Sequence, residues 1–164
     1  MNTLDRRRFL IAAAATAATA AATTARAAGD ALLSITVKGI EGGVALTEDD
    51  LLALPQHEIV TETDFTEGRT TFRGPLAKDV LALAGVSAAT TLKMTAANDY
   101  AVDIPFADFD RYGVVMAMSV DGERLTRRSR GPIWLMYPIG EAAEADREAM
   151  NDKLIWQLVR VEVR

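Results

Sequence analysis

The amino-acid sequence predicts one α+β domain that is rich in strands and carries a few short helices at its margin. Within many short segments, apolar and polar residues alternate with a period of two, which is typical of half-buried strands. Turn-forming Gly, Asp and Asn residues separate these segments, and only a few short stretches have helical periodicity. Because the sequence contains no internal repeat and no linker, we expect a single hydrophobic core.

Strand-like alternation recurs along most of the chain. The Asp121-Gly122 pair marks a two-residue hairpin turn, because both positions tolerate a positive φ. The last segment alternates as well and predicts one long closing strand. We expect strands over residues 33–37, 57–63, 70–73, 91–96, 101–104, 114–120, 123–125, 133–137 and 154–163.

Helix signals are fewer. Thr47 is a good N-cap for a short helix with acidic residues in its first turn, and Pro55 marks its end. The clearest helix begins with Pro75 at its first position and ends at Gly85. We expect a further short helix over residues 106–111, and either a surface loop or a weak helix over residues 141–148.

The N-terminus resembles a twin-arginine signal peptide. Arg6 and Arg7 precede apolar residues and an Ala/Thr-rich run to Ala22, and Ala25-Arg26-Ala27 has the small-x-small pattern of a cleavage site. The run is too short and too weakly apolar to remain as a membrane anchor. The sequence therefore predicts export to the periplasm, cleavage after residue 27, a mature domain over residues 28–164, and no membrane insertion after cleavage.

Charge and composition exclude several functions. The chain has 18 basic and 23 acidic residues. Removal of the predicted signal peptide takes away four arginines and one aspartate, which leaves 14 basic and 22 acidic residues and a net charge of −8. Such an acidic domain is a poor partner for nucleic acid. The absence of cysteine excludes disulfides, thiolate metal ligands and cysteine nucleophiles. No phosphate-binding loop, nucleophile elbow or histidine pair is present, so no catalytic residue is assigned.

Five segments resemble the molybdopterin-binding domain of sulfite-oxidase-type oxidoreductases. The stretch from Thr71 to Leu81 is similar to the family's strand-to-helix entry, and four further segments follow in the family's order. The resemblance implies a strand-rich α+β fold of the sulfite-oxidase molybdopterin-binding type. The further segments are Asn98-Asp99-Tyr100 with Ile104-Pro105, Met118 to Leu125, Gly131-Pro132 with Tyr137-Pro138, and Trp156 to Val163.

The chain departs from this family at the metal and pterin positions. Active members are expected to hold molybdenum through a cysteine thiolate, which is absent here; Asp64 is the side chain that would replace it if molybdenum is bound, and a carboxylate is a hard oxygen ligand. Trp134 and Ile155 stand where the resemblance implies an arginine and a lysine. We therefore expect no retained cofactor, with molybdopterin bound to molybdenum as the alternative.

An arginine cluster is the first candidate binding site. Arg124, Arg127, Arg128 and Arg130 fall within seven positions of an otherwise acidic domain. Guanidinium groups capture phosphate, sulfate or carboxylate through charge-assisted hydrogen bonds. The alternative is a solvated hairpin edge, where arginine discourages aggregation between edges.

Aromatic and turn residues form the second candidate site. Trp134 and Trp156 could stack on a flat heterocycle, or could simply belong to the core. The resemblance implies that Asn98, Asp99 and Tyr100 lie near the cofactor mouth, although Asn and Asp are also ordinary turn residues.

These observations lead to a first hypothesis: an exported, non-catalytic module that binds a small anionic or heterocyclic ligand and serves a redox or signalling partner, either periplasmic or in the membrane. The alternative is a molybdenum-cofactor oxidoreductase with a non-cysteine ligand set. The twin-arginine signal favours this alternative, because that route suits proteins that load a cofactor before export. A third possibility is an interaction domain without a small ligand.

Overall fold

The computed structural model describes residues 31–39, 41–88 and 91–164. The predicted signal peptide, residues 1–27, and the predicted domain start at residue 28 lie outside the described residues. No helix in the described part of the chain has the length and apolar character needed to cross a membrane.

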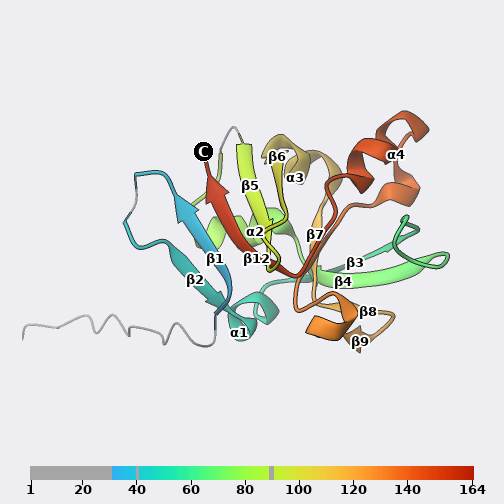
Figure 1. Ribbon diagram of the computed structural model, residues 1–164, viewed down its shortest axis with the longest axis horizontal. Coiled ribbons are helices and arrows are strands. Elements are labelled where there is room, and N and C mark those ends of the chain that lie inside the picture. The colour runs from blue at the N-terminus through green and yellow to red at the C-terminus, as the bar shows by residue number, and fades with distance from the viewer. Residues whose placement is uncertain (1–30, 40, 89–90) are drawn as a thin grey trace, which may run out of the picture.

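A five-stranded sheet with the order β2-β1-β12-β5-β6 forms one side of the molecule (Figure 1). Its strands β1 and β12 pair in parallel, and the other neighbours pair antiparallel. This brings the first and last strands of the domain side by side at the centre of the sheet. The strands are β1 (Ala31–Val37), β2 (Val44–Thr47), β5 (Thr91–Ala96), β6 (Ala101–Pro105) and β12 (Leu158–Val163).

Two smaller sheets complete the strand-rich architecture, with the orders β3-β4-β8-β9 and β11-β10-β7. Their strands are β3 (Gln56–Thr61), β4 (Thr70–Pro75), β7 (Val115–Ala117), β8 (Ser119–Val120), β9 (Glu123–Arg124), β10 (Trp134–Met136) and β11 (Ile155–Trp156). The helices are α1 (Glu48–Leu52), α2 (Ala77–Leu83), α3 (Ala107–Tyr112) and α4 (Glu144–Asn151), with short 3-10 turns η1 (Arg127–Ser129) and η2 (Ile139–Glu141). The predicted α+β class is confirmed.

The buried core combines residues of the large sheet, the two smaller sheets and the helices. Leu33 and Ile35 of β1 are fully buried, while Ser34 between them is partly exposed, as the period-two pattern predicts. Val80 and Leu81 of α2 and Phe109 of α3 belong to the same buried cluster. This apolar burial is the main stabilising contribution to the fold.

Local signals explain where several elements begin and end. Thr47 caps α1 as predicted, because its side chain accepts from the Asp50 amide and the Asp50 carboxylate accepts from the Thr47 amide at 2.8 Å. Asp121 and Gly122 have φ values of 48° and 83°, so the predicted hairpin turn is confirmed. Gly113 ends α3 with a left-handed φ of 60°.

The predicted helix start at Pro75 is wrong. Pro75 is the last residue of β4, and α2 begins at Ala77 with Leu76 as N-cap. Gly74 pairs with β3, and a Cβ atom added to Gly74 would lie 2.0 Å from the Met116 carbonyl oxygen. This close approach to β7 holds the Gly-Pro pair in extended backbone rather than in a helix.

Two predicted strands are each divided between sheets. The 154–163 segment is interrupted at Gln157, whose φ is 53°, so β11 joins the three-stranded sheet and β12 the large sheet. The 114–120 segment is likewise split at Met118 into β7 and β8. Strand β2 has no counterpart among the predicted strands, and of the two alternatives for residues 141–148 the helix is the one formed, as α4.

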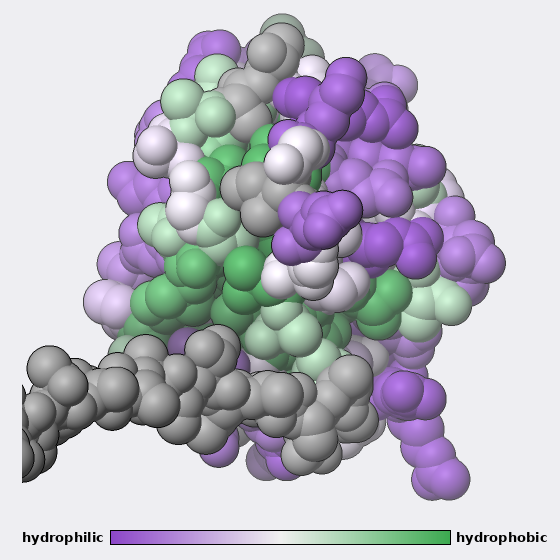
Figure 2. Space-filling view, turned by 90° about the vertical axis from the view of Figure 1, so that its left-hand side faces the viewer, coloured by the Kyte–Doolittle hydropathy of each residue, from purple (hydrophilic) through white to green (hydrophobic). Residues whose placement is uncertain are grey.

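Figure 2 shows the side of the molecule that carries β1 and β2. Hydrophobic residues form a band across the middle of this face, and hydrophilic residues lie mainly to its right.

Candidate functional site

The two tryptophans predicted as site residues meet in one aromatic cluster. Trp134 and Trp156 are register partners on β10 and β11, with ring centroids 6.4 Å apart and planes at 90°. Phe72 of β4 packs against Trp134 at 5.3 Å, and Phe65 of the β3–β4 loop packs against Trp156 at 5.1 Å. Edge-to-face contacts of this kind add to the stabilisation from burial.

Arg130 covers this cluster. Its guanidinium carbon lies 5.1 Å from the ring centroid of Trp134 and 5.9 Å from that of Trp156. Its Nη1 group donates a hydrogen bond to the Phe65 carbonyl oxygen. Both interactions hold the cation over the aromatic faces. The left-handed φ of 70° at Arg130, directly after η1, turns the chain toward the cluster.

A cavity of about 540 Å³ opens beside the cluster, and we call it the Arg–Trp cavity. Trp134 is only 3% exposed, so its ring forms a floor rather than an open stacking platform. The indole Nε1 of Trp134 has no hydrogen-bond partner among the described residues. The cavity is lined by Thr66, Glu67, Thr70, Val120, Asp121, Leu125, Arg128, Ser129, Arg130 and Trp134.

The four predicted arginines do not face a single pocket. Arg128 and Arg130 line the Arg–Trp cavity, whereas Arg124 and Arg127 line a different cavity of about 600 Å³. Arg124 is also paired with Glu48 of α1. The predicted cluster is thus divided between two cavities, and among the described contacts only Arg130 lies over the tryptophan rings.

The predicted turn residues lie next to Trp156. The Asn98 side chain accepts a hydrogen bond from the Tyr100 amide at 3.2 Å, and Asp99 has a left-handed φ of 65°. Asn98 and Tyr100 line a hollow of about 20 Å³ with Trp156. The structure therefore brings Asn98 and Tyr100 to the edge of the aromatic cluster, while Asp99 is exposed in the turn.

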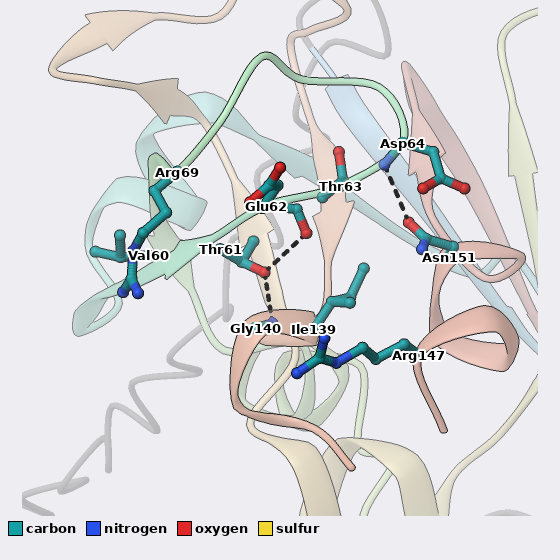
Figure 3. A pocket seen from close by; sticks show the side chains of 10 residues that line it. All are labelled: Val60, Thr61, Glu62, Thr63, Asp64, Arg69, Ile139, Gly140, Arg147 and Asn151. Atoms are coloured by element: carbon teal, nitrogen blue, oxygen red, sulfur yellow. Dashed lines mark hydrogen bonds between the residues drawn. The ribbon is translucent and has the colours of Figure 1, made fainter. Parts of the chain in front are cut away.

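Asp64 lies in a third cavity, of about 450 Å³, between the β3–β4 loop, η2 and α4 (Figure 3). The Asp64 amide donates to the Asn151 side chain at 3.5 Å. We call this space the charged cavity, because Glu62, Asp64, Arg69 and Arg147 line it. The other lining residues are Val60, Thr61, Thr63, Ile139, Gly140 and Asn151.

Sequence reasoning missed three side chains at these sites: Phe65, Arg69 and Arg147. Phe65 is an aromatic residue in a polar loop, and this is the one local signal that distinguishes it. Arg69 and Arg147 lie 78 positions apart, and the packing of η2 against β3 and of α4 against η2 brings them to the same cavity.

A buried polar network lies at the other end of β10. Tyr137 is fully buried and donates to Asp108 Oδ2 at 3.1 Å, and Lys153 Nζ donates to the same oxygen at 2.7 Å. Burial raises the pKa of the Tyr137 hydroxyl well above its ordinary value, and the neighbouring Asp108 carboxylate raises this pKa further. Tyr137 is therefore a neutral hydrogen-bond donor.

Among the described residues, no group of three or more His, Cys, Asp and Glu side chains is placed to hold a metal ion. Asp64 and Glu62 are the acidic residues of the charged cavity, and their carboxylates are hard oxygen donors. The cavity therefore offers no soft ligand.

Comparisons with known proteins identify the family and the fold of the chain. The sequence model of the family described as the oxidoreductase molybdopterin binding domain matches residues 22–145. Among solved structures, the chain is similar to the sulfane dehydrogenase SoxCD from Paracoccus pantotrophus, with a TM-score of 0.58 and 18% sequence identity. That alignment covers 80% of this chain and 37% of the SoxCD chain, so the chain spans well under half of that relative. No curated protein sequence matches the chain.

The SoxCD similarity shows the fold, and the family match covers most of the sequence. The resemblance predicted from the five segments is thereby confirmed. The chain belongs to the family of oxidoreductase molybdopterin-binding domains.

Proposed function

We propose that this family member is an exported, non-catalytic module that binds a small anionic or heterocyclic ligand in the Arg–Trp cavity. The observation that carries the proposal is the position of Arg130 over both tryptophans at the edge of a 540 Å³ cavity. Pockets of this size, with an apolar floor and a few convergent polar groups, are typical of small-molecule sites.

The lining of the cavity supports an anionic ligand. Arg128 and Arg130 form no ion pair with a carboxylate among the described residues, so their guanidinium groups are available to an oxyanion. The buried Nε1 of Trp134 costs about 1–3 kcal/mol while it lacks a partner. A ligand acceptor that reached Nε1 after a small shift of the ring would remove that cost.

The donor set does not fit a thiolate-bound molybdenum ion. The sequence contains no cysteine, and the Asp64 carboxylate that would replace it is exposed and shares its cavity with Arg69 and Arg147. This supports a ligand-binding role over metal-dependent catalysis. Such a module would serve a redox or signalling partner in the periplasm, to which the Arg6-Arg7 signal would direct it.

Intrinsic fluorescence tests the proposed site directly, because Trp134 and Trp156 are the only two tryptophans in the chain. Titration with phosphate, benzoate and a free pterin is expected to change the emission with at least one of them. Replacing Arg130 with Gln should weaken that binding by about tenfold, which corresponds to the loss of one charge-assisted hydrogen bond. Arg73→Gln is the control, because Arg73 pairs with Glu58 outside the cavity.

An unchanged emission with every ligand, or equal binding by the Arg130 variant, would contradict the proposed site. Elemental analysis and pterin fluorescence test the alternative on protein expressed with its own leader in a host that makes the molybdenum cofactor. Near-stoichiometric molybdenum and pterin would overturn the non-catalytic proposal and make Asp64 the first residue to replace. Absence of both is the expected result.

A further inference from the structure

The loop between β3 and β4, residues 62–69, is held to the rest of the protein at few points. In Figure 1 it joins the two strands at the right-hand side of the molecule. Among the described residues, two hydrogen bonds and one ring contact connect it to segments beyond its flanking strands. These are the bond from Arg130 Nη1 to the Phe65 carbonyl oxygen, the bond from the Asp64 amide to Asn151 at 3.5 Å, and the packing of the Phe65 ring on Trp156.

The tip of this loop keeps its shape through its own hydrogen bonds. The Thr66 hydroxyl accepts from the Thr63 amide at 3.2 Å, and the Thr66 amide donates to the Thr63 carbonyl oxygen at 3.2 Å. The Phe65 amide donates to the Thr63 hydroxyl at 3.1 Å. Turns closed by threonine side chains in this way need no support from a neighbouring segment. Moving the Phe65 ring off Trp156 therefore breaks none of these bonds.

Phe65 is attached to the aromatic cluster by both its ring and its backbone. The ring lies edge-on against Trp156 at 5.1 Å, and the residue is 37% exposed. Its carbonyl oxygen accepts from Arg130, whose guanidinium carbon lies 5.9 Å from the centroid of the same Trp156 ring. We call these two contacts of Phe65, with Arg130 and with Trp156, the latch. A single guanidinium group thus covers the rings and holds the loop.

A bound oxyanion competes with this latch. Arg130 lines the Arg–Trp cavity, and an anionic oxygen is a stronger acceptor for a guanidinium group than a neutral carbonyl oxygen. Glu67 of the loop lines the same cavity, so an anion beside Arg130 also repels the loop. Both effects draw Arg130 and the Phe65 carbonyl apart.

We propose that an oxyanion bound to Arg130 opens the latch, so that Phe65 leaves Trp156 and the β3–β4 loop is released; this regulation rests on the proposed function, because it concerns the same cavity. Binding and release are reciprocal: a ligand that favours the open loop binds more tightly when the loop is already open. Glu62 and Asp64 of the loop line the charged cavity, so a ligand in one cavity changes the wall of the other.

The latch itself is tested on the full chain without any ligand. In Arg130→Gln, a glutamate-specific protease should cleave after Glu67 about ten times faster, because cleavage follows the population of open loop and one charge-assisted hydrogen bond is lost. Acrylamide should also quench the tryptophan emission more strongly. Trp134 is only 3% exposed, so the added quenching reports on Trp156. Arg128→Gln is the matched control, since Arg128 lines the same cavity and forms no contact with the loop among the described residues.

Phosphate and benzoate then test the release by a ligand. Each anion that changes the tryptophan emission should speed cleavage after Glu67 in the unsubstituted protein. The same anion should cause no further rise in Arg130→Gln, and this comparison also controls for any effect of the anion on the protease.

Phe65→Ala separates the latch from the binding groups, because it opens the loop and leaves Arg130 in place. The Kd of the anion should fall about fivefold, which corresponds to the loss of one aromatic pair that opposes binding. Val60→Ala is the control: Val60 is a similarly exposed apolar residue of the same hairpin and does not line the Arg–Trp cavity. A residue that merely formed part of the binding wall would give the opposite sign, with weaker binding after truncation.

Three results would overturn the proposal while the proposed function stands. The first is equal cleavage after Glu67 in Arg130→Gln and the unsubstituted protein. The second is an anion that binds without speeding this cleavage. The third is unchanged or weaker anion binding by Phe65→Ala. If neither anion alters the emission, the proposed function fails instead, and the release by a ligand fails with it even where Arg130→Gln opens the loop.

Discussion

Strand β10 has a polar cluster near each of its ends, and the two clusters differ in how completely their polar groups are partnered. After the strand ends, Tyr137 and Lys153 both donate to Asp108, and all three side chains are at least three-quarters buried. At its start, Trp134 has a buried Nε1 without a partner among the described residues, and Arg130 lies over the rings and donates to one carbonyl oxygen.

This difference separates two roles that buried polar groups can have. A network in which each donor has its acceptor stabilises one conformation and offers nothing to a ligand. A cluster with an unpartnered donor and an accessible cation gives up some stability and can recover it when a ligand binds. The contrast predicts that substitutions at the two ends of β10 have unequal effects on unfolding, and three substitutions test this.

Loss of the shared acceptor should have the largest effect. Asp108→Ala leaves Tyr137 without a partner and removes the counterion of Lys153. We expect the free energy of unfolding in urea to fall by about 3 kcal/mol, because the substitution leaves the remaining polar and charged groups of the network buried without a partner. Asp110→Ala is the control, since Asp110 is exposed on the same helix α3. Equal losses of unfolding free energy in the two variants would show that Asp108 in the network contributes no more stability than an exposed aspartate.

Removal of the Tyr137 hydroxyl should have an intermediate effect that depends on pH. At about pH 7, Tyr137→Phe should lower the free energy of unfolding by about 1 kcal/mol, which is the usual contribution of one hydrogen bond. Because burial raises the pKa of Tyr137 above its ordinary value of 10.0, the native state keeps this proton at a pH where the unfolded state loses it.

The stability that Tyr137 contributes is therefore complete below pH 10.0 and declines above it. The decline should be about 1.4 kcal/mol for each pH unit, so the advantage of the unsubstituted protein should disappear near about pH 11. Urea unfolding of both proteins at several pH values measures the difference. A difference that stays constant from about pH 7 to about pH 11 would show that the tyrosine is not held neutral as described.

Replacement of the cation over the tryptophans should have the smallest effect on stability. Arg130→Gln should cost only about 0.5 kcal/mol, because an exposed cation–π contact contributes little. Arg128→Gln, which removes an exposed arginine of the same cavity, should cost less still. If Arg130→Gln destabilised the fold as strongly as Asp108→Ala, the distinction between a structural and a binding cluster would fail.

The local elements of the fold were predictable because their signals are contained in a few neighbouring residues. Thr47 and Asp50 cap α1 through contacts three positions apart, and the Asp121-Gly122 turn needs only two residues that accept a positive φ. The break at Gln157 was not predictable from its neighbours, because Trp156, Gln157 and Leu158 keep the apolar-polar-apolar order of a continuous strand. Its conformation is fixed by bonds to distant segments: its amide donates to the Arg130 carbonyl and its carbonyl accepts from the Ala97 amide.

The site was predictable in its residue types and not in its grouping. The sequence placed Arg124 and Arg130 in one cluster, but η1 and the left-handed turn at Arg130 direct them to different cavities. Trp134 and Trp156 come together through strand pairing across 22 positions, which no local pattern encodes. Arg147 reaches the charged cavity only because η2 packs on β3.

The junction at Gln157 also restricts how the chain can change in length. It is the single residue between Trp156, which faces the aromatic cluster, and Leu158, which is buried in the large sheet. Because successive strand side chains point to opposite faces, deleting or inserting one residue here would turn the inward set of β12 toward solvent or rotate Trp156 away from Trp134. The left-handed φ of 53° and the hydrogen bond from the Gln157 side chain to the Arg127 carbonyl oxygen already limit which residues fit at position 157, and a one-residue change in length should be tolerated still less.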